Sequence, residues 1–547
     1  MDSVLLKFTN YIKLFIKILI QNLMSSKASK YIDFPFNQLS KKNGGILKFK
    51  DHKYDYSINP QKTQLDLINF FNTEASKELK NSNITYEVNK IIKISNSHEI
   101  ISENETYSNL SSTLDAKIEF KINNETFKTE IKPGSLYNIS LKKNENIKIN
   151  SNKQLCFSQS FVNKQKENTV KKNNIIIFID GLIGEIVNNK EKFQNLLPNT
   201  YDYFKDGTIF SNHYSNGEWS LPSAANFFSG CYTDKHKLFH NEKNHQINSK
   251  LKLLGEVFSE NDYYTFMING SWRMVPNYGF IKGIDKYIYK KNMSAVETIN
   301  HFINIDSRIK NSKKFYWLTF FDLHGVGLKN EFGGNFFINK KKSLKSVHQK
   351  FNDALQKEYY FGCSLLDTKL SCLYNYIKTN YEHKEVNISI ITDHGQSFFD
   401  SEKDVLKDNR IKVPWLIKSK NIPPGIQNYF SENVDLYPTL LKINNIDYDV
   451  KTIDGGLPIS LGGKSKNFSK SQSIYPNHPY LLRVDSINNV YKFESEQKLR
   501  ENMTWDDLKQ KKLTIKSKQE NYIEDKNETK EAERLYDFSC KRFLDQI

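Results

Sequence analysis

The sequence predicts an α/β protein: a doubly wound, mostly parallel sheet with helices on both faces, preceded by a smaller β-sandwich-like domain. Three observations support this prediction. A continuous β-branched run at 174–179 is typical of a strand buried on both faces of a parallel sheet, and 387–392 is predicted to be another such strand. Apolar residues recur at helical spacing between 344 and 376. Before residue 165, short runs alternate polar and apolar residues instead, as antiparallel strands do.

Composition argues against a disordered chain, a nucleic-acid-binding protein and a small disulfide- or zinc-stabilised fold. The 547 residues are 38% hydrophobic and 13% aromatic, which is enough for a large core and for more than one domain. The formal net charge is +17, but lysines are spread along the whole chain without a nucleic-acid-binding motif. We therefore expect no nucleic acid partner. Five cysteines without a C-x-x-C pair indicate neither a disulfide framework nor a zinc knuckle.

The N-terminal segment Val4–Leu23 is rich in Leu, Ile and Phe but is interrupted by Lys7, Lys13 and Lys17. These lysines fit a cleavable signal peptide poorly. Each would cost roughly 2.5–3.5 kcal/mol at the centre of a membrane span. An amphipathic helix that contacts a membrane peripherally fits better. The predicted location is accordingly cytoplasmic or peripheral to the membrane.

Pattern changes along the chain predict its division into parts. Alternating apolar residues between Ile118 and Ile149, broken by turn residues, predict successive antiparallel strands. A charged linker at 164–174 follows. We expect an amphipathic helix, an accessory domain that is β-rich from about 116, a catalytic domain, and a C-terminal extension packing on it: 1–28, 29–165, 172–500 and 501–547.

Ionisable residues follow three predicted strands, at 174–179, 315–321 and 387–392. They are Asp180, Asp322 with His324, and Asp393 with His394. In open α/β sheets, ligands bind outside the carboxyl ends of the strands. Carboxylate and imidazole ligands suit a divalent metal ion such as Zn²⁺, Mg²⁺, Mn²⁺ or Ca²⁺. Such an ion would lower the pKa of a bound hydroxyl.

The stretch Ser215–Gly230 predicts a nucleophile at the start of a helix. Ser220 precedes Pro222 by two residues, and proline is well tolerated in the first turn of a helix. Free N–H groups and the helix dipole favour an anion there. Taken alone, Ser220 would be interpreted as an N-cap. The ionisable residues at the ends of three strands favour instead a nucleophile that attacks a charged ester.

Taken in order, these motifs resemble the sulfatase-like proteins of the alkaline phosphatase superfamily, a group of sulfatases, phosphoesterases and phosphoethanolamine-type transferases. The resemblance runs from Asn173 to the C-terminus and implies an alkaline-phosphatase-like fold. The segments that carry it are Ile175–Gly181, Ser220–Gly230, Asp322–Gly325, Thr392–Gly395, Val413–Ile417, Asn433–Leu441, Asp454-Gly455, Tyr491–Phe493 and Leu535–Asp537.

The resemblance implies roles for individual residues. Asp180, Asp393 and His394 would be metal ligands. Ser220 would be the nucleophile and a further ligand of the metal. His324 would face the ester or its leaving group, as an acid or an anion contact. Additional metal or substrate contacts would come from Asp322 and His478.

Two positions depart from the sulfatase pattern. Sulfatases carry a second acid directly after the first, where this chain has Gly181. They also carry an arginine four residues after the nucleophile, needed for its conversion to formylglycine, and here that position is Ala224. The departures favour an unmodified Ser220 that attacks phosphorus.

Three hypotheses about function follow. The first is a metal-dependent hydrolase or transferase that acts through Ser220 on a phosphate-type ester, such as one on a cell-surface glycan or a lipid-linked sugar. The second is a sulfatase whose serine becomes formylglycine. The third is a non-catalytic protein that binds an anionic glycan. Joint retention of the nucleophile and the ionisable residues at the strand ends argues against the third.

Overall fold

The computed structural model describes residues 32–33, 45–49, 52–56, 85–112, 114–122, 125–131, 136–163, 173–239, 246–324, 353–399, 405–500, 503–518 and 525–544. The predicted N-terminal amphipathic helix lies outside these residues and stays a prediction. No helix within them is long and apolar enough to cross a membrane. The chain forms two compact units, one centred on 84–167 and the other made mainly of 168–306 and 313–547.

The first unit is an antiparallel β-domain. The long strand β9 pairs with β4 along one edge, and along its other edge with β6 and then β5. Its core is built from alternate residues of these strands, such as Ile118, Phe120 and Ile147. The strands are β1 (Ile32–Asp33), β2 (Gly45–Phe49), β3 (His52–Tyr56), β4 (Tyr86–Ile101), β5 (Thr106–Ser111), β6 (Ala116–Ile122), β7 (Glu125–Ile131), β8 (Leu136–Leu141), β9 (Asn146–Ser158) and β10 (Phe161–Val162).

A mixed, mostly parallel sheet forms the centre of the second unit. Its strands run in the order β15-β14-β16-β11-β17-β18-β12-β19, and those from β15 to β17 are parallel. Ile175 pairs with Ile388 of the neighbouring strand, so the two runs that predicted the sheet lie side by side. The strands are β11 (Asn173–Ile179), β12 (Thr208–Phe210), β14 (Tyr264–Asn269), β15 (Lys286–Tyr289), β16 (Lys314–Phe320), β17 (Val386–Ile391), β18 (Trp415–Lys418) and β19 (Gly425–Gln427).

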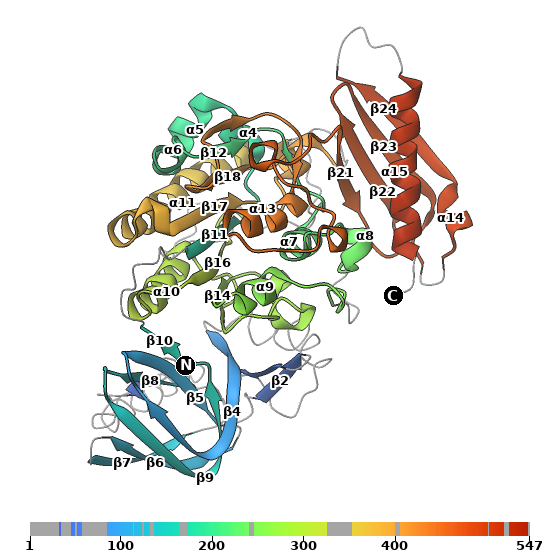
Figure 1. Cartoon of the computed structure of the whole chain (residues 1–547). Coiled ribbons are helices and arrows are strands. Elements are labelled where there is room, and N and C mark those ends of the chain that lie inside the picture. The colour runs from blue at the N-terminus through green and yellow to red at the C-terminus, as the bar shows by residue number, and fades with distance from the viewer. Residues whose placement is uncertain are drawn as a thin grey trace, which may run out of the picture. The chain divides into compact units, whose positions relative to one another are not determined.

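Helices cover both faces of this sheet (Figure 1). On one face α10 and α11 meet through Phe302 and Tyr376, whose rings lie 5.7 Å apart. On the other face α7 lies against α9 and α13. The doubly wound prediction is therefore confirmed. The helices are α4 (Gly184–Asn188), α5 (Lys190–Leu196), α6 (Pro198–Phe204), α7 (Ser220–Ser229), α8 (Thr233–His236), α9 (Leu254–Glu260), α10 (Ala295–Arg308), α11 (Asp353–Asn380), α12 (Asp408–Ile411) and α13 (Leu436–Ile443).

The end of the chain folds into a four-stranded antiparallel sheet within the second unit. The sheet begins at Phe468, so it includes residues of both the predicted catalytic domain, 172–500, and the predicted C-terminal extension, 501–547. Its first strand pairs with the segment before Ser220 through a bridge between Gln472 and Gly217. The elements are β21 (Phe468–Ser473), β22 (Pro479–Ser486), β23 (Asn489–Lys498), α14 (Trp505–Lys509), β24 (Lys511–Ser517) and α15 (Lys526–Leu544).

Candidate functional site

Ser220 is the first residue of α7 and is fully buried. The preceding residue, Trp219, has extended backbone and is the N-cap, and no side chain caps this helix. The Ser220 hydroxyl is therefore not used to satisfy a helix N–H. It donates instead to Asp180 Oδ2, at 3.1 Å, and lies 3.3 Å from His394 Nε2.

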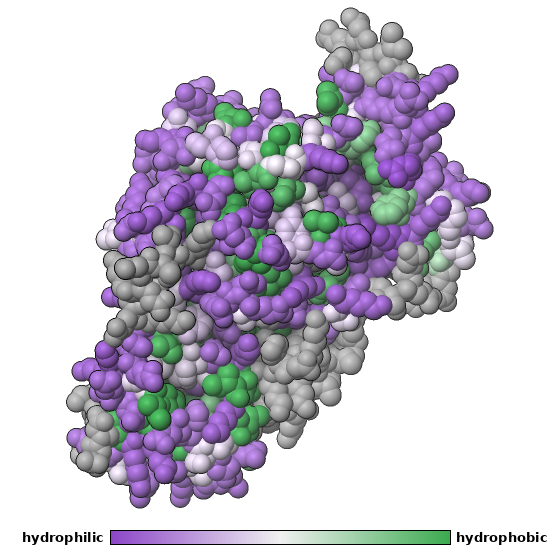
Figure 2. Space-filling view, in the orientation of Figure 1, coloured by the Kyte–Doolittle hydropathy of each residue, from purple (hydrophilic) through white to green (hydrophobic). Residues whose placement is uncertain are grey.

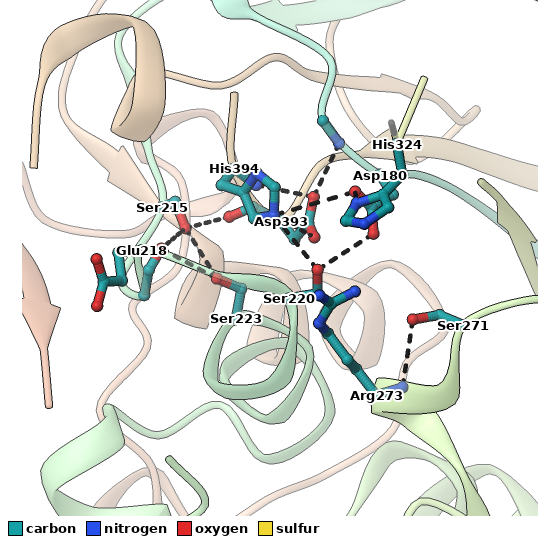
Figure 3. A network of polar contacts seen from close by, with 12 residues as sticks. Asp180, Ser215, Glu218, Ser220, Ser223, Ser271, Arg273, His324, Asp393 and His394 are labelled. Atoms are coloured by element: carbon teal, nitrogen blue, oxygen red, sulfur yellow. Dashed lines mark hydrogen bonds and ion pairs between the residues drawn. The ribbon is translucent and has the colours of Figure 1, made fainter. Parts of the chain in front are cut away.

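Two neighbouring parallel strands bring the predicted metal ligands together. Asp180 follows β11, while Asp393 and His394 follow β17, which is paired with β11. One ligand atom from each of the three lies within 4.8 Å of the others, and all three side chains are buried. Figure 3 shows them gathered around the Ser220 hydroxyl at the start of α7. The carboxyl-end rule for parallel sheets accounts for this arrangement.

The tautomer of His394 shows that a cation fits here. Its Nδ1 lies 2.8 Å from the Gly395 carbonyl oxygen, which can only accept, so Nδ1 carries the proton. Burial and then the charge of Arg410 lower the pKa of His394, so the ring is neutral and Nε2 has a lone pair. That lone pair faces Asp393 Oδ2 at 3.2 Å, and this buried oxygen accepts no hydrogen bond from the described residues. When Asp393 is ionised, the two atoms are an unfavourable pair of acceptors, which a metal ion would turn into two ligands.

The donor set narrows the choice of metal. Asp180, Asp393 and His394 would supply two carboxylates and one imidazole nitrogen, and a fourth position would be left for the Ser220 hydroxyl. Three protein ligands with a further exchangeable position are typical of catalytic zinc. Calcium takes six to eight oxygen ligands, and imidazole suits transition metals better. The donors thus fit Zn²⁺ or a similar transition ion better than Ca²⁺.

The pKa values of the two carboxylates are shifted in opposite directions. Burial by itself raises the pKa of Asp180, but His324, His394 and Arg273 outweigh it and hold that pKa well below the usual carboxyl range. For Asp393, burial and then the negative charge of Asp180 both raise the pKa. Without a cation, the pair therefore retains a proton on Asp393 at a pH where an exposed carboxyl has lost it.

This proton makes metal binding pH-dependent. A metal ion needs the ionised carboxylate, so binding must displace the proton from Asp393. Because the pKa of Asp393 is raised, we expect metal affinity to fall as pH is lowered from about 8.5 to about 6.5, by up to roughly tenfold per pH unit. Calorimetry in buffers of different ionisation enthalpy would measure the proton released. An affinity that is flat over this range would contradict the prediction.

Gly181 explains why the second acid of sulfatases is absent. Its φ is +83°, in the left-handed region that favours glycine. A Cβ at this position would collide with Gln396 Nε2, which donates to the Gly181 carbonyl oxygen at 3.1 Å. The end of the Gln396 side chain would have to move to admit a Cβ at this position. The described residues around the metal site offer two carboxylates.

His324 lies on the open side of the cluster. Its Nδ1 is 2.9 Å from Asp180 Oδ1, and 32% of its side chain is exposed, whereas the side chain of Asp180 is fully buried. An entering ester would therefore meet His324 from the solvent side. This position suits the predicted role as an acid or anion contact.

Asp322 and His478 lie outside the three-residue cluster. Asp322 Oδ1 pairs with Lys369 Nζ of α11 at 3.1 Å. His478 is exposed in the turn before β22, where its ring contacts that of Tyr475. A role in binding substrate stays a prediction for both.

Arg273 is a candidate site residue that the sequence analysis missed. It follows β14 in a short 3-10 helix, Trp272–Met274. Figure 3 shows its guanidinium beside Ser220, and its charge acts on Asp180 and Asp393. Nε and Nη1 are buried, and neither has a hydrogen-bond partner among the described residues. The carboxyl-end rule, applied to β14, points to this segment.

The comparisons with known proteins identify the family and the fold. The family model Sulfatase matches residues 172–446. A protein of Bacteroides thetaiotaomicron VPI-5482, provisionally described as a sulfatase, is similar in structure, with a TM-score of 0.53 and 16% identity over 69% of this chain and 93% of its own. A 2-O GAG sulfatase has a TM-score of 0.53 and 15% identity, with the same coverage. A comparison with curated proteins finds no match.

At such low identity the structures show the fold alone, whereas the family match covers half of the chain and includes Asp180, Ser220, Asp393 and His394. Members of the sulfatase superfamily are ester hydrolases. The chain belongs to the sulfatase family.

Proposed function

We propose that the protein is a metal-dependent hydrolase or transferase that acts on a phosphate-type ester through unmodified Ser220. The observation that carries this proposal is the position of the Ser220 hydroxyl. It donates to Asp180 at 3.1 Å and lies 3.3 Å from the lone pair of His394. Arg273 lies beside it, and its Nε and Nη1 have no hydrogen-bond partner among the described residues. A nucleophile next to a metal site and a free guanidinium is what attack on an anionic ester needs.

The reaction follows from these positions. A bound divalent ion would lower the pKa of the Ser220 hydroxyl and offset the negative charge of the ester. Ser220 loses its hydroxyl proton to solvent, and its Oγ forms a bond to phosphorus as the bond from phosphorus to the ester oxygen breaks. The fork of donors on Arg273 suits the non-bridging oxygens of the phosphoryl group. His324, which faces solvent, gives a proton to the departing alkoxide.

The second half of the reaction releases Ser220. Water or an acceptor hydroxyl gives a proton to His324 and attacks phosphorus. The bond to Ser220 Oγ breaks, and the serine oxygen takes a proton from solvent, which restores both residues. Hydrolysis and transfer share the phosphoserine intermediate and differ only in the acceptor. The proposal therefore covers both.

Two positions support phosphorus over sulfur as the reacting atom. Ala224 is completely buried in α7, where sulfatases have the arginine that accompanies formylglycine. Gly181 stands where sulfatases have the second acid, and its φ of +83° favours glycine. The alternative is a formylglycine sulfatase, and the family match favours it.

An anionic ester on a glycan or a lipid-linked sugar is our proposal for the substrate. The name of one similar structure gives a glycosaminoglycan as its substrate. The net charge of +17 would attract an anion over long range.

Activity on matched esters tests the proposal. Purified protein, stripped of metal, would be assayed on aryl phosphate monoesters, aryl phosphate diesters and aryl sulfates, with Zn²⁺, Mn²⁺, Mg²⁺ and Ca²⁺ restored singly. We expect phosphate-ester cleavage that depends on a transition ion. Cleavage of the sulfates alone would favour the alternative, and absence of any stoichiometric metal would favour a binding protein.

The Arg273 side chain is expected to contribute strongly to turnover. Arg273→Ala removes donors aimed at the substrate and should lower kcat/KM by roughly 10²–10³-fold. Arg273→Lys keeps the charge without the fork and should recover only part of this loss. Arg534→Gln is the control, because Arg534 is exposed and pairs with Glu531 of its own helix. Equal activity in Arg273→Ala and Arg534→Gln would exclude this role.

A further inference from the structure

Arg410 joins the two loops that hold the site. It lies in the short helix α12 and is 4% exposed. Its Nε donates to the carbonyl oxygen of Glu218, at 2.8 Å, and its Nη1 donates to the carbonyl oxygen of Gly395, at 3.0 Å. Glu218 stands two residues before the nucleophile Ser220. One planar group thus links the nucleophile loop to the loop after β17.

The Gly395 carbonyl transmits this contact to the metal ligand His394. The same oxygen accepts the hydrogen bond from His394 Nδ1, at 2.8 Å. That bond selects the tautomer whose Nε2 lone pair faces Ser220. Outer contacts of this kind fix the ring orientation of a metal-binding histidine and tune its basicity. Arg410 therefore acts on the ligand through one shared carbonyl group.

The backbone around Arg410 holds the loop after β17 in place as well. The Gly395 N–H donates to the Arg410 carbonyl oxygen at 2.7 Å, and the Gln396 N–H donates to that of Asn409 at 2.9 Å. A Cβ at Gly395 would collide with the Asn409 carbonyl oxygen, so glycine is required for this close approach. The guanidinium is consequently held at a fixed distance from the ligand loop.

Charge adds a second contribution. The positive charge of Arg410 interacts with Glu218, Asp393 and Asp180, in decreasing order. Two buried carboxylates without a compensating charge would repel each other strongly. A fixed guanidinium offsets part of this repulsion without occupying a ligand position.

From these contacts we propose that Arg410 is a positioning residue, which sets the distance and orientation of Ser220 relative to the metal ligand His394. The proposal rests on the proposed function, because it assigns Ser220 and His394 their roles. It assigns Arg410 no contact with the substrate. Losing it should therefore lower kcat and metal affinity while KM changes little.

Arg410→Lys tests this proposal, because lysine keeps the buried charge but lacks the planar fork that reaches both carbonyl groups. Arg542→Lys is the matched control. Arg542 also holds two partners, Asp234 and Asp454, but hydrogen-bonds to neither loop. Zn²⁺ affinity would be measured by calorimetry on metal-free protein, alongside kcat, KM and the midpoint of thermal unfolding.

We expect Arg410→Lys to bind Zn²⁺ roughly 10–100-fold more weakly than the wild type, with a similar fall in kcat. Arg542→Lys should lower the unfolding midpoint and leave Zn²⁺ affinity unchanged. Unchanged Zn²⁺ affinity and kcat in a folded Arg410→Lys protein would overturn the inference. A wild type that binds no metal would instead overturn the proposed function, so the two failures are distinguishable.

Discussion

Ser220→Ala is expected to abolish turnover, with kcat reduced by roughly 10⁴-fold or more, because the attacking atom is removed. Asp180, Asp393 and His394 remain, so the variant should still bind a stoichiometric metal ion. The protein should also stay folded, since alanine is a good helix former and the Ser220 hydroxyl caps no helix N–H. Steady-state kinetics and metal analysis of the same preparation would measure both properties.

Ser229→Ala is the matched control for this variant. Ser229 is also buried and ends the same helix, but its hydroxyl donates to the carbonyl oxygen of Ala225. Its loss should change kcat only slightly. A Ser220→Ala protein with the turnover of the control would show that another group is the nucleophile.

Asp393→Asn is expected to remove most of the bound metal, together with the activity. The substitution keeps the shape of the side chain, and an amide oxygen can still accept from the Gly181 and His394 N–H groups, as Asp393 Oδ1 does at 3.1 and 2.8 Å. Only the charge and one metal-binding oxygen are lost. We expect metal affinity to fall by more than about 100-fold, which exceeds the effect of losing an outer contact.

Asp367→Asn separates this effect from general damage. Asp367 is also fully buried, but it accepts hydrogen bonds from the Asn199 and Thr200 N–H groups at the start of α6. The control should lose some stability and keep its metal. If metal content were the same in Asp393→Asn and the wild type, the assignment of the ligands would be wrong.

The sequence predicted the parts of the fold that repeat a strong local pattern. The run 174–179 is apolar except at Asn174, and the run 387–391 except at Asn387 and Ser389. A strand covered on both faces buries such runs. Their register then places Asp180 and Asp393 together without further information. Pro222 likewise marked the first turn of α7. Local chemistry and topology were sufficient in these cases.

The strands before residue 116 were missed for a physical reason. All six residues of β5, Thr106–Ser111, are buried, although most of them are polar. Asn109 is satisfied by partners far along the chain, its N–H by the Ser158 hydroxyl and its side-chain amide by Asn138. Polar residues can be buried when distant groups satisfy their hydrogen bonds, and such a strand shows no alternation of polar and apolar residues in its sequence.

Long-range pairing also decided which site residues could be predicted. Arg273 and Arg410 reach the site from segments that carry no motif, and a long flexible side chain leaves no periodic trace in the sequence. Asp322 resembled a ligand because it follows a strand, yet its partner Lys369 lies 47 positions further along the chain. The sequence could place Asp322 at the correct edge of the sheet. It could not show that the carboxylate of Asp322 forms an ion pair with Lys369.

Peptide mass analysis of Ser220, in protein from its native host and after brief incubation with an aryl phosphate, tests the central claim most directly. The account predicts an unmodified serine before incubation and a phosphoryl group on Ser220, but not on the nearby Ser223, after it. Loss of two hydrogens at Ser220 before any incubation would reveal formylglycine and contradict the account.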